Sequence, residues 1–263
     1  MGAILNGKRR EKGHLDRHFD KDLKYHEVIA REYDGVVVAP RQCTNDALYK
    51  KFAPLMRGQR MLDLGCGTGH MSLRFGDRFS EVLAVDHSAA MMDVARAKVA
   101  ARKLPVKFQC VSVFDYIDTA PADYFDAVCC TGFLHHLKAE DIGPTLLKVA
   151  RLMRPKAVLL TSEPIHVPAG SVPQRVSAWN AVSVAATLSY SQHVEQPDEA
   201  PIEQQTLLSA FETAGLALVK THRNWEIFPH HLPPRFSDRA AIRLLNALYG
   251  KAGNVFTAAA LKP

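Results

Sequence analysis

Long hydrophobic runs are absent from this sequence. No apolar stretch approaches the roughly 18 residues that a membrane-spanning helix needs, so we expect no membrane-embedded segment. The N-terminal residues also lack the apolar core of a secretory signal peptide. These two absences favour a cytoplasmic protein without a membrane partner.

Cysteine is scarce, and its spacing argues against two common kinds of site. The five cysteines stand at positions 43, 66, 110, 129 and 130, and none forms a C-x-x-C pair. Four of them fall in expected strands or in a loop at a strand end. The pattern predicts buried, reduced thiols rather than a disulfide framework or a zinc site. The chain has twelve histidines, but no H-E-x-x-H or similar spacing joins them, so the sequence predicts no metal site.

The sequence also lacks a strong excess of positive or negative charge. The formal net charge is +6 and the isoelectric point is about 9.1. This is less basic than a dedicated nucleic-acid binder, and part of the charge lies in one run at residues 8–12. We interpret that run as a solvated chain end, and we expect no nucleic-acid partner.

Along the middle of the chain, short apolar segments typical of buried strands alternate with segments that have the apolar periodicity of a helix. Strands are expected at residues 60–64, 81–85, 106–111, 125–130, 157–161, 216–222 and 255–261. Helices are expected at residues 26–33, 47–52, 88–99 and 142–153, with a short one from about residue 69 and a further one that holds Leu207, Leu208 and Phe211 and is closed by Gly215. Strands that are apolar on both faces and alternate with helices predict a parallel α/β sheet with helices on both faces.

The alternation also predicts how the chain is divided. Residues 1–42 are polar and charged and are expected to form an N-terminal cap or lid, while residues 43–263 form the α/β domain. After residue 163 the alternation breaks, and residues 164–202 hold five of the fifteen prolines. We expect a partly helical insertion there that lies over the sheet as a small lid.

The stretch MLDLGCGTGH, residues 61–70, places Gly65, Gly67 and Gly69 directly after a strand. Glycine allows positive φ and lets a ligand touch the backbone, so the loop suits a nucleotide-like ligand at the carboxyl edge of a sheet. A dinucleotide fingerprint needs its third glycine at position 70, which is His70. Asp86 closes the next strand, where a carboxylate can accept hydrogen bonds from a ribose diol.

Four segments in this order carry a resemblance to a known family. LDLGCGTG, AVDHSAAMM, FDAVCCTGFLHHL and LLKVARLMRPKAVLL resemble the class I S-adenosylmethionine-dependent methyltransferases of the small-molecule type, over about residues 44–163. The resemblance implies a Rossmann-like, seven-stranded, mostly parallel sheet whose last strand is antiparallel. It implies S-adenosylmethionine as the cofactor, S-adenosylhomocysteine as its product, and in-line displacement of the methyl group.

The resemblance also implies a set of cofactor-binding residues. Asp63 and the glycines would hold the methionine end and Asp86 the ribose, while Ser112 stands where many members have an acid that contacts the adenine. By position in the motifs, the cofactor-binding residues are Tyr33, Asp63, Gly65, Gly67, Gly69, Asp86, His87, Met91, Ser112, Val113 and Thr131.

Histidines at two strand ends are the candidates for chemistry. His135 and His136 follow the fourth expected strand, and His166 follows the fifth. Histidine is the usual general base near neutral pH, so we interpret these three as candidate catalytic residues, with packing and backbone capping as the open alternative. An acceptor pocket or simple packing would account for five further aromatic and histidine side chains: Trp179, Tyr190, His193, Trp225 and Phe228.

The sequence thus predicts O- or N-directed methyl transfer to a small-molecule acceptor by a monomer or homodimer. An RNA or protein methyltransferase stays open as an alternative, although the fourth strand is not followed by the N/D-P-P-Y/F motif of enzymes that methylate base amines. A protein that binds the cofactor without catalysis, as a partner subunit, is an alternative of another class. An NAD(P) oxidoreductase is disfavoured by His70.

Overall fold

The computed structural model describes residues 14–187, 199–227 and 235–263. Seven strands form one sheet in the order β3-β2-β1-β4-β5-β7-β6, and β7 runs antiparallel to both of its neighbours. The pairs among the first five strands are parallel. The strands are β1 (Arg60–Leu64), β2 (Glu81–Asp86), β3 (Val106–Cys110), β4 (Phe125–Thr131), β5 (Met153–Pro164), β6 (Ala217–Asn224) and β7 (Val255–Leu261). The expected sheet with an antiparallel last strand is confirmed.

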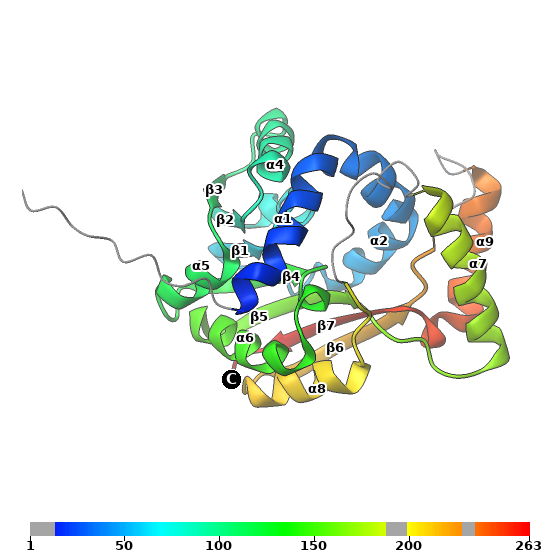
Figure 1. Ribbon diagram of the computed structural model, residues 1–263. Helices are drawn as coiled ribbons and strands as arrows, with labels where there is room; N and C mark the ends of the chain where they lie inside the picture. Colours follow the sequence, from blue (N-terminus) through cyan, green and yellow to red (C-terminus); the bar gives the residue numbers. More distant parts are fainter. Residues whose placement is uncertain (1–13, 188–198, 228–234) are drawn as a thin grey trace, which may run out of the picture.

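Helices cover both faces of this sheet, because successive strand side chains point to opposite sides. Leu62 and Leu64 pack into the core under α5, α6 and α8, whereas Met61 packs with α2 and α3. Figure 1 shows the two layers, with α1 and α2 on one side of the sheet and α6 and α8 on the other. The helices are α1 (His14–Tyr33), α2 (Ala39–Phe52), α3 (His70–Phe75), α4 (Ala89–Ala101), α5 (Val113–Thr119), α6 (Ala139–Leu152), α7 (Ser171–Thr187), α8 (Gln204–Thr213) and α9 (Phe236–Tyr249).

The N-terminal helices differ from the prediction of two short, separate ones. A π-helical turn, Asp34–Val38, joins α1 to α2 without a break. Pro40, which has no N–H to donate, stands just after this π turn, where the regular α-helical hydrogen-bond pattern is already interrupted. Thr44, a residue type that would suit the cap of a helix starting near residue 47, instead donates its hydroxyl to the Arg41 carbonyl inside the helix. The expected start of a helix near residue 47 is therefore wrong.

The expected buried cysteines are confirmed in part. Cys66, Cys129 and Cys130 are buried free thiols. Cys110 is exposed, so that prediction is wrong, because β3 is the edge strand of the sheet and much of its surface faces solvent. In the part of the chain that the structure describes, no helix is both long and apolar enough to cross a membrane.

The insertion after β5 contains α7 and a short return to the sheet. Helices α7 and α9 lie side by side at one end of the molecule (Figure 1), and Val176 of α7 packs on the small core of Trp225, Ile227 and Ile242. A bridge between Ile165 and Ile202 closes the base of the insertion. The predicted helical content of this segment is thus present.

Helix α1 is fastened to the domain through acidic side chains. Glu27 accepts hydrogen bonds from the Ser88 hydroxyl (2.8 Å) and the Ala90 backbone N–H (3.2 Å), at the start of α4. Asp34 accepts one from Thr68 in the glycine loop (2.6 Å) and pairs with Lys98. The charges suit these positions, because carboxylates are stabilised at helix N-termini.

We predict that Glu27→Ala will loosen α1. The change removes both bonds at the α4 N-terminus and should lower the free energy of unfolding by about 1 kcal/mol. It should also speed amide hydrogen exchange in α1. Glu32→Ala, on an exposed position of the same helix, is the control and should change stability by less than about 0.5 kcal/mol. Equal exchange rates in the two variants would contradict the proposed anchoring.

Candidate active site

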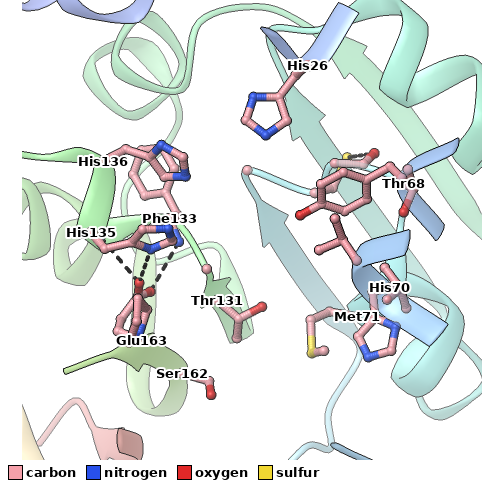
Figure 2. Close-up of a pocket in the computed structure, with 18 of the residues that line it drawn as sticks. His26, Thr68, His70, Met71, Thr131, Phe133, His135, His136, Ser162 and Glu163 are labelled. Atoms are coloured by element: carbon pink, nitrogen blue, oxygen red, sulfur yellow. Dashed lines mark hydrogen bonds and ion pairs between the residues drawn. The ribbon is translucent and has the colours of Figure 1, made fainter. Parts of the chain in front are cut away.

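A cavity of about 440 Å³ opens at the carboxyl edge of the sheet. Its walls come from α1 and α2, the loops after β1 and β4, the ends of β2 and β5, and residues 199–201. In Figure 2, His135, His136 and Glu163 stand on one side, Thr68, His70 and Met71 on the other, and Thr131 and Ser162 lie between them. Segments far apart in sequence therefore meet at one concave site.

The glycine loop lies along one wall, in a conformation that other residues rarely adopt. Gly65, Gly67 and Gly69 have φ values of +69°, +49° and +79°. A Cβ on Gly65 would approach the Phe133 ring to 3.0 Å, whereas one on Gly67 would meet nothing closer than 3.9 Å. The loop is thus packed tightly at its start and leaves the Gly67 backbone open, which fits a ligand that touches the main chain.

The Asp86 carboxylate is held beside this loop. Its Oδ2 accepts the Gly67 N–H (2.8 Å) and its Oδ1 accepts the Ser88 N–H (2.9 Å). These bonds fix the side chain at the cavity wall, and each oxygen retains acceptor capacity. The donor and acceptor set fits a nucleoside ribose.

Asp63 lies under the same loop and is only 3% exposed. Its Oδ2 accepts the backbone N–H (2.8 Å) and the hydroxyl (2.6 Å) of Ser72 in α3. Burial raises the pKa of Asp63 to about 7, and the nearby Asp86 charge acts in the same direction, while the bonds from Ser72 oppose the rise.

Nine of the eleven predicted cofactor residues line the cavity, and two do not. Gly69 begins α3 and packs on Ala95, while Ser112 begins α5. The residues that line the cavity are Tyr33, Asp63, Gly65, Gly67, Asp86, His87, Met91, Val113 and Thr131.

His135 is held by a buried carboxylate. Its Nδ1 lies 2.9 Å from Oε2 of Glu163, which is fully buried and also accepts the backbone N–H groups of Phe133 (3.2 Å) and His135 (3.3 Å). Burial alone would lower the pKa of His135, but the carboxylates of Glu163 and Glu199 raise it to about 9. At neutral pH this imidazole is protonated, which argues against His135 as a general base.

His136 faces an acid from the N-terminal helix. Its Nδ1 lies 3.0 Å from Oδ1 of Asp22, and Asp22 also lies near His26 (3.3 Å) and His87 (3.6 Å). Burial would raise the pKa of Asp22, but the imidazoles of His136 and His26 outweigh it and hold that pKa well below its usual range. Glu199 approaches both adjacent histidines at 3.7 Å. We call this group the histidine–carboxylate cluster: Asp22, His26, His135, His136, Glu163 and Glu199.

Sequence reasoning missed several residues of this site. Asp22 and His26 come from a helix expected to begin only at residue 26, and Glu199 lies within the proline-rich segment 164–202, which carries no motif. Arg41 and Glu226 face one another at 3.6 Å on another part of the wall. None of these positions carries a local signal, because each is brought to the cavity by tertiary packing.

Other predicted residues lie elsewhere. His166 is half exposed, pairs with Glu203 at 3.9 Å, and does not line the cavity. Trp225 is fully buried and donates its indole N–H to the Tyr249 carbonyl (3.0 Å), so it packs the small core at α9. Trp179 is 40% exposed and lies outside the cavity lining. Tyr190, His193 and Phe228 lie outside the described residues.

Comparison with known proteins agrees with this geometry. Residues 61–156 match the family described as "Methyltransferase domain". A ubiquinone biosynthesis O-methyltransferase of Rhodopseudomonas palustris (strain HaA2) is 34% identical over 109 residues, which is 41% of this chain and 40% of the relative. The matches span about two fifths of the length of the curated relatives. The resemblance seen in the sequence motifs is confirmed.

Solved structures extend the likeness of fold to most of the chain. The DhpI–SAH complex superposes with a TM-score of 0.60 at 17% identity and covers 93% of this chain and 96% of its own. The [4+2]-cyclase SpnF superposes with a TM-score of 0.55 at 17% identity and covers 90% and 96%. At such identities the likeness concerns the fold alone.

The raised pKa of Asp63 predicts a pH-dependent stability. The unfolded carboxyl titrates near pH 3.9 and the folded one near 7, so the folded state binds more protons between these values. The contribution of Asp63 to the free energy of unfolding therefore falls as the pH rises from about 4 to about 7, by up to about 1.4 kcal/mol per pH unit. Asp63→Asn keeps an acceptor for Ser72 and removes the titration.

Urea unfolding at pH 5 and pH 8 tests this prediction. Relative to the wild type, the Asp63→Asn protein should gain stability between pH 5 and pH 8. Asp93→Asn changes an exposed carboxylate on α4 and serves as the control that follows the wild-type pH dependence. A constant difference between wild type and Asp63→Asn would mean that Asp63 does not titrate in this range.

Proposed function

The chain carries a methyltransferase domain of the class I S-adenosylmethionine-dependent type, and on this premise we propose that it methylates a small-molecule acceptor. One observation carries the proposal. A single cavity joins the glycine loop and Asp86 on one wall to the histidine–carboxylate cluster on another. A nucleoside site and an acceptor site would then be in direct contact.

The first wall supports S-adenosylmethionine as the cofactor. The open backbone at Gly67 and the fixed Asp86 carboxylate would hold the nucleoside, and His87 and Met91 would flank its base. When bound, the cofactor supplies a methyl group on a positively charged sulfur, which leaves readily. The chain's own residues then have to hold the acceptor in line with that group and keep water away.

The N-terminal segment supports an acceptor small enough to be enclosed. Helices α1 and α2 supply a wall of the cavity, and Asp22, Glu27 and Asp34 fasten that wall to the domain. We therefore propose that residues 1–42 include the cap of the site, as their composition predicts. A folded RNA or a protein side chain on a surface would need this cap to move aside.

The second wall supports an O- or N-directed reaction, because it presents polar groups. His135 stays protonated at neutral pH through Glu163, so it would position or neutralise an acceptor rather than deprotonate it. His136 is then the predicted catalytic histidine that faces the acceptor. The name of the Rhodopseudomonas relative, which includes O-methyl transfer in ubiquinone biosynthesis, favours an oxygen acceptor.

Cofactor use without methyl transfer is the second candidate. One observation favours it, namely that SpnF, a protein of the same fold, is a [4+2]-cyclase. The two candidate functions can be separated by incubating the protein with methyl-labelled S-adenosylmethionine and pools of small molecules. Mass spectrometry then detects any labelled product. Labelled product supports transfer, and binding without any labelled product over a broad set of hydroxyl and amine acceptors favours the alternative.

We predict that Asp86→Ala will lose binding of S-adenosylhomocysteine. Loss of two hydrogen bonds from a ribose to a charged group should weaken the affinity at least 10-fold. Calorimetric titration of the wild type, Asp86→Ala and the control Asp93→Ala measures this directly, with NADH as the competing ligand. Absence of S-adenosylhomocysteine binding by the wild type, or NADH binding in its place, would overturn the proposed function.

A further inference from the structure

We propose that the histidine–carboxylate cluster is a binding site for a divalent transition-metal ion. Its ligands are His135, His136 and Glu199, with Asp22 as a fourth. Ligand atoms of the first three residues all lie within 4.8 Å of one another. The four side chains line the cavity, so an ion held by them would face the acceptor space.

The orientation of His135 is the first support. Glu163 occupies its Nδ1 at 2.9 Å, so the ring is fixed and Nε2 points toward Glu199. Figure 2 shows the contact between Glu163 and His135, with the His136 ring above that of His135 and tilted by 39° to it. A carboxylate on the far nitrogen is the usual way in which proteins orient a metal-binding imidazole.

The separations between the groups are the second support. Each oxygen of Glu199 lies 3.7 Å from a different imidazole nitrogen, Nε2 of His135 and Nδ1 of His136. This is too long for a hydrogen bond. Ligand atoms that sit about 2.1 Å from one ion are themselves about 3.0–3.5 Å apart, so a small shift of Glu199 would close a coordination shell.

Asp22 supplies the third support. Its Oδ1 is buried and lies 3.0 Å from Nδ1 of His136 and 3.3 Å from Nδ1 of His26. This oxygen therefore stands beside the nitrogen that His136 would offer to an ion. A cation bound between Asp22 and His136 would offset the charge of the buried carboxylate, as the imidazoles do without it.

The donor set indicates the class of ion. Two imidazole nitrogens with carboxylate oxygens suit Zn²⁺, Fe²⁺ or Mn²⁺, whereas Mg²⁺ and Ca²⁺ prefer oxygen alone. The sequence predicts no metal site because its histidines show none of the short spacings typical of metal ligands. Here the ligands come from α1, the turn after β4 and the segment that ends the insertion.

An ion at this place would displace the proton from Nε2 of His135, and it would bind an acceptor oxygen and lower the pKa of its hydroxyl. His136 would then act through the ion. This role rests on the proposed function, but the metal site itself does not.

Zinc binding to the full-length, metal-stripped protein tests the site without any assay of methyl transfer. Calorimetry with Zn²⁺ should give one ion per chain, and Co²⁺ in its place should give visible absorption bands of a nitrogen- and oxygen-ligated ion. Glu199→Gln and His136→Ala should each weaken binding at least 10-fold. Glu163 orients His135 without binding the ion itself, so Glu163→Gln should weaken zinc binding about 10- to 100-fold.

Glu203→Gln is the matched control, because Glu203 pairs with the exposed His166 and is outside the cavity. It should bind zinc as the wild type does. Glu199→Gln is the decisive variant should His136→Ala fail to fold, and S-adenosylhomocysteine binding checks its integrity. No stoichiometric zinc in the wild type, or equal affinity in Glu199→Gln and Glu203→Gln, would overturn the metal site while leaving the proposed function standing.

Discussion

The buried carboxylate of Glu163 is the constraint on which the rest of the site depends. It stands at the end of β5 and accepts two backbone N–H groups from the loop after β4 together with the His135 imidazole. These bonds fix a loop that would otherwise carry unsatisfied donors at a sheet edge. His136 is therefore presented to the cavity from a rigid position, and Phe133 is held against Gly65.

The loop after β4 is connected in turn to the N-terminal helix by side-chain contacts. Asp22 meets His136, Glu27 meets the start of α4, and Asp34 meets the glycine loop. Single exposed ion pairs contribute little to stability, but these contacts are partly buried and reach three different parts of the domain. The cap is consequently part of the cavity wall rather than an addition to it.

The two walls of the cavity differ in how much of each belongs to the segment that matches the methyltransferase family. The glycine loop and Asp86 belong to the matched methyltransferase segment, and in the proposed function they hold the cofactor. The opposite wall combines that segment with α1 and residue 199, both outside the match. Proteins of this fold include a [4+2]-cyclase, so the fold alone does not determine the chemistry, which depends on the residues of the second wall.

The sequence by itself determined those elements that a short run of residues is enough to specify. The apolar strands, the positive-φ glycines and the carboxylate at the end of β2 could be read from the sequence, because period, spacing and residue type specify them. Only the tertiary structure decided what depends on distant neighbours. It merged two expected helices through a π turn, exposed Cys110 on an edge strand, buried Trp225 away from the cavity, and left His166 outside it. It also brought Asp22 and Glu199 to His136, since charge pairing across a cavity leaves no trace in the spacing of either segment.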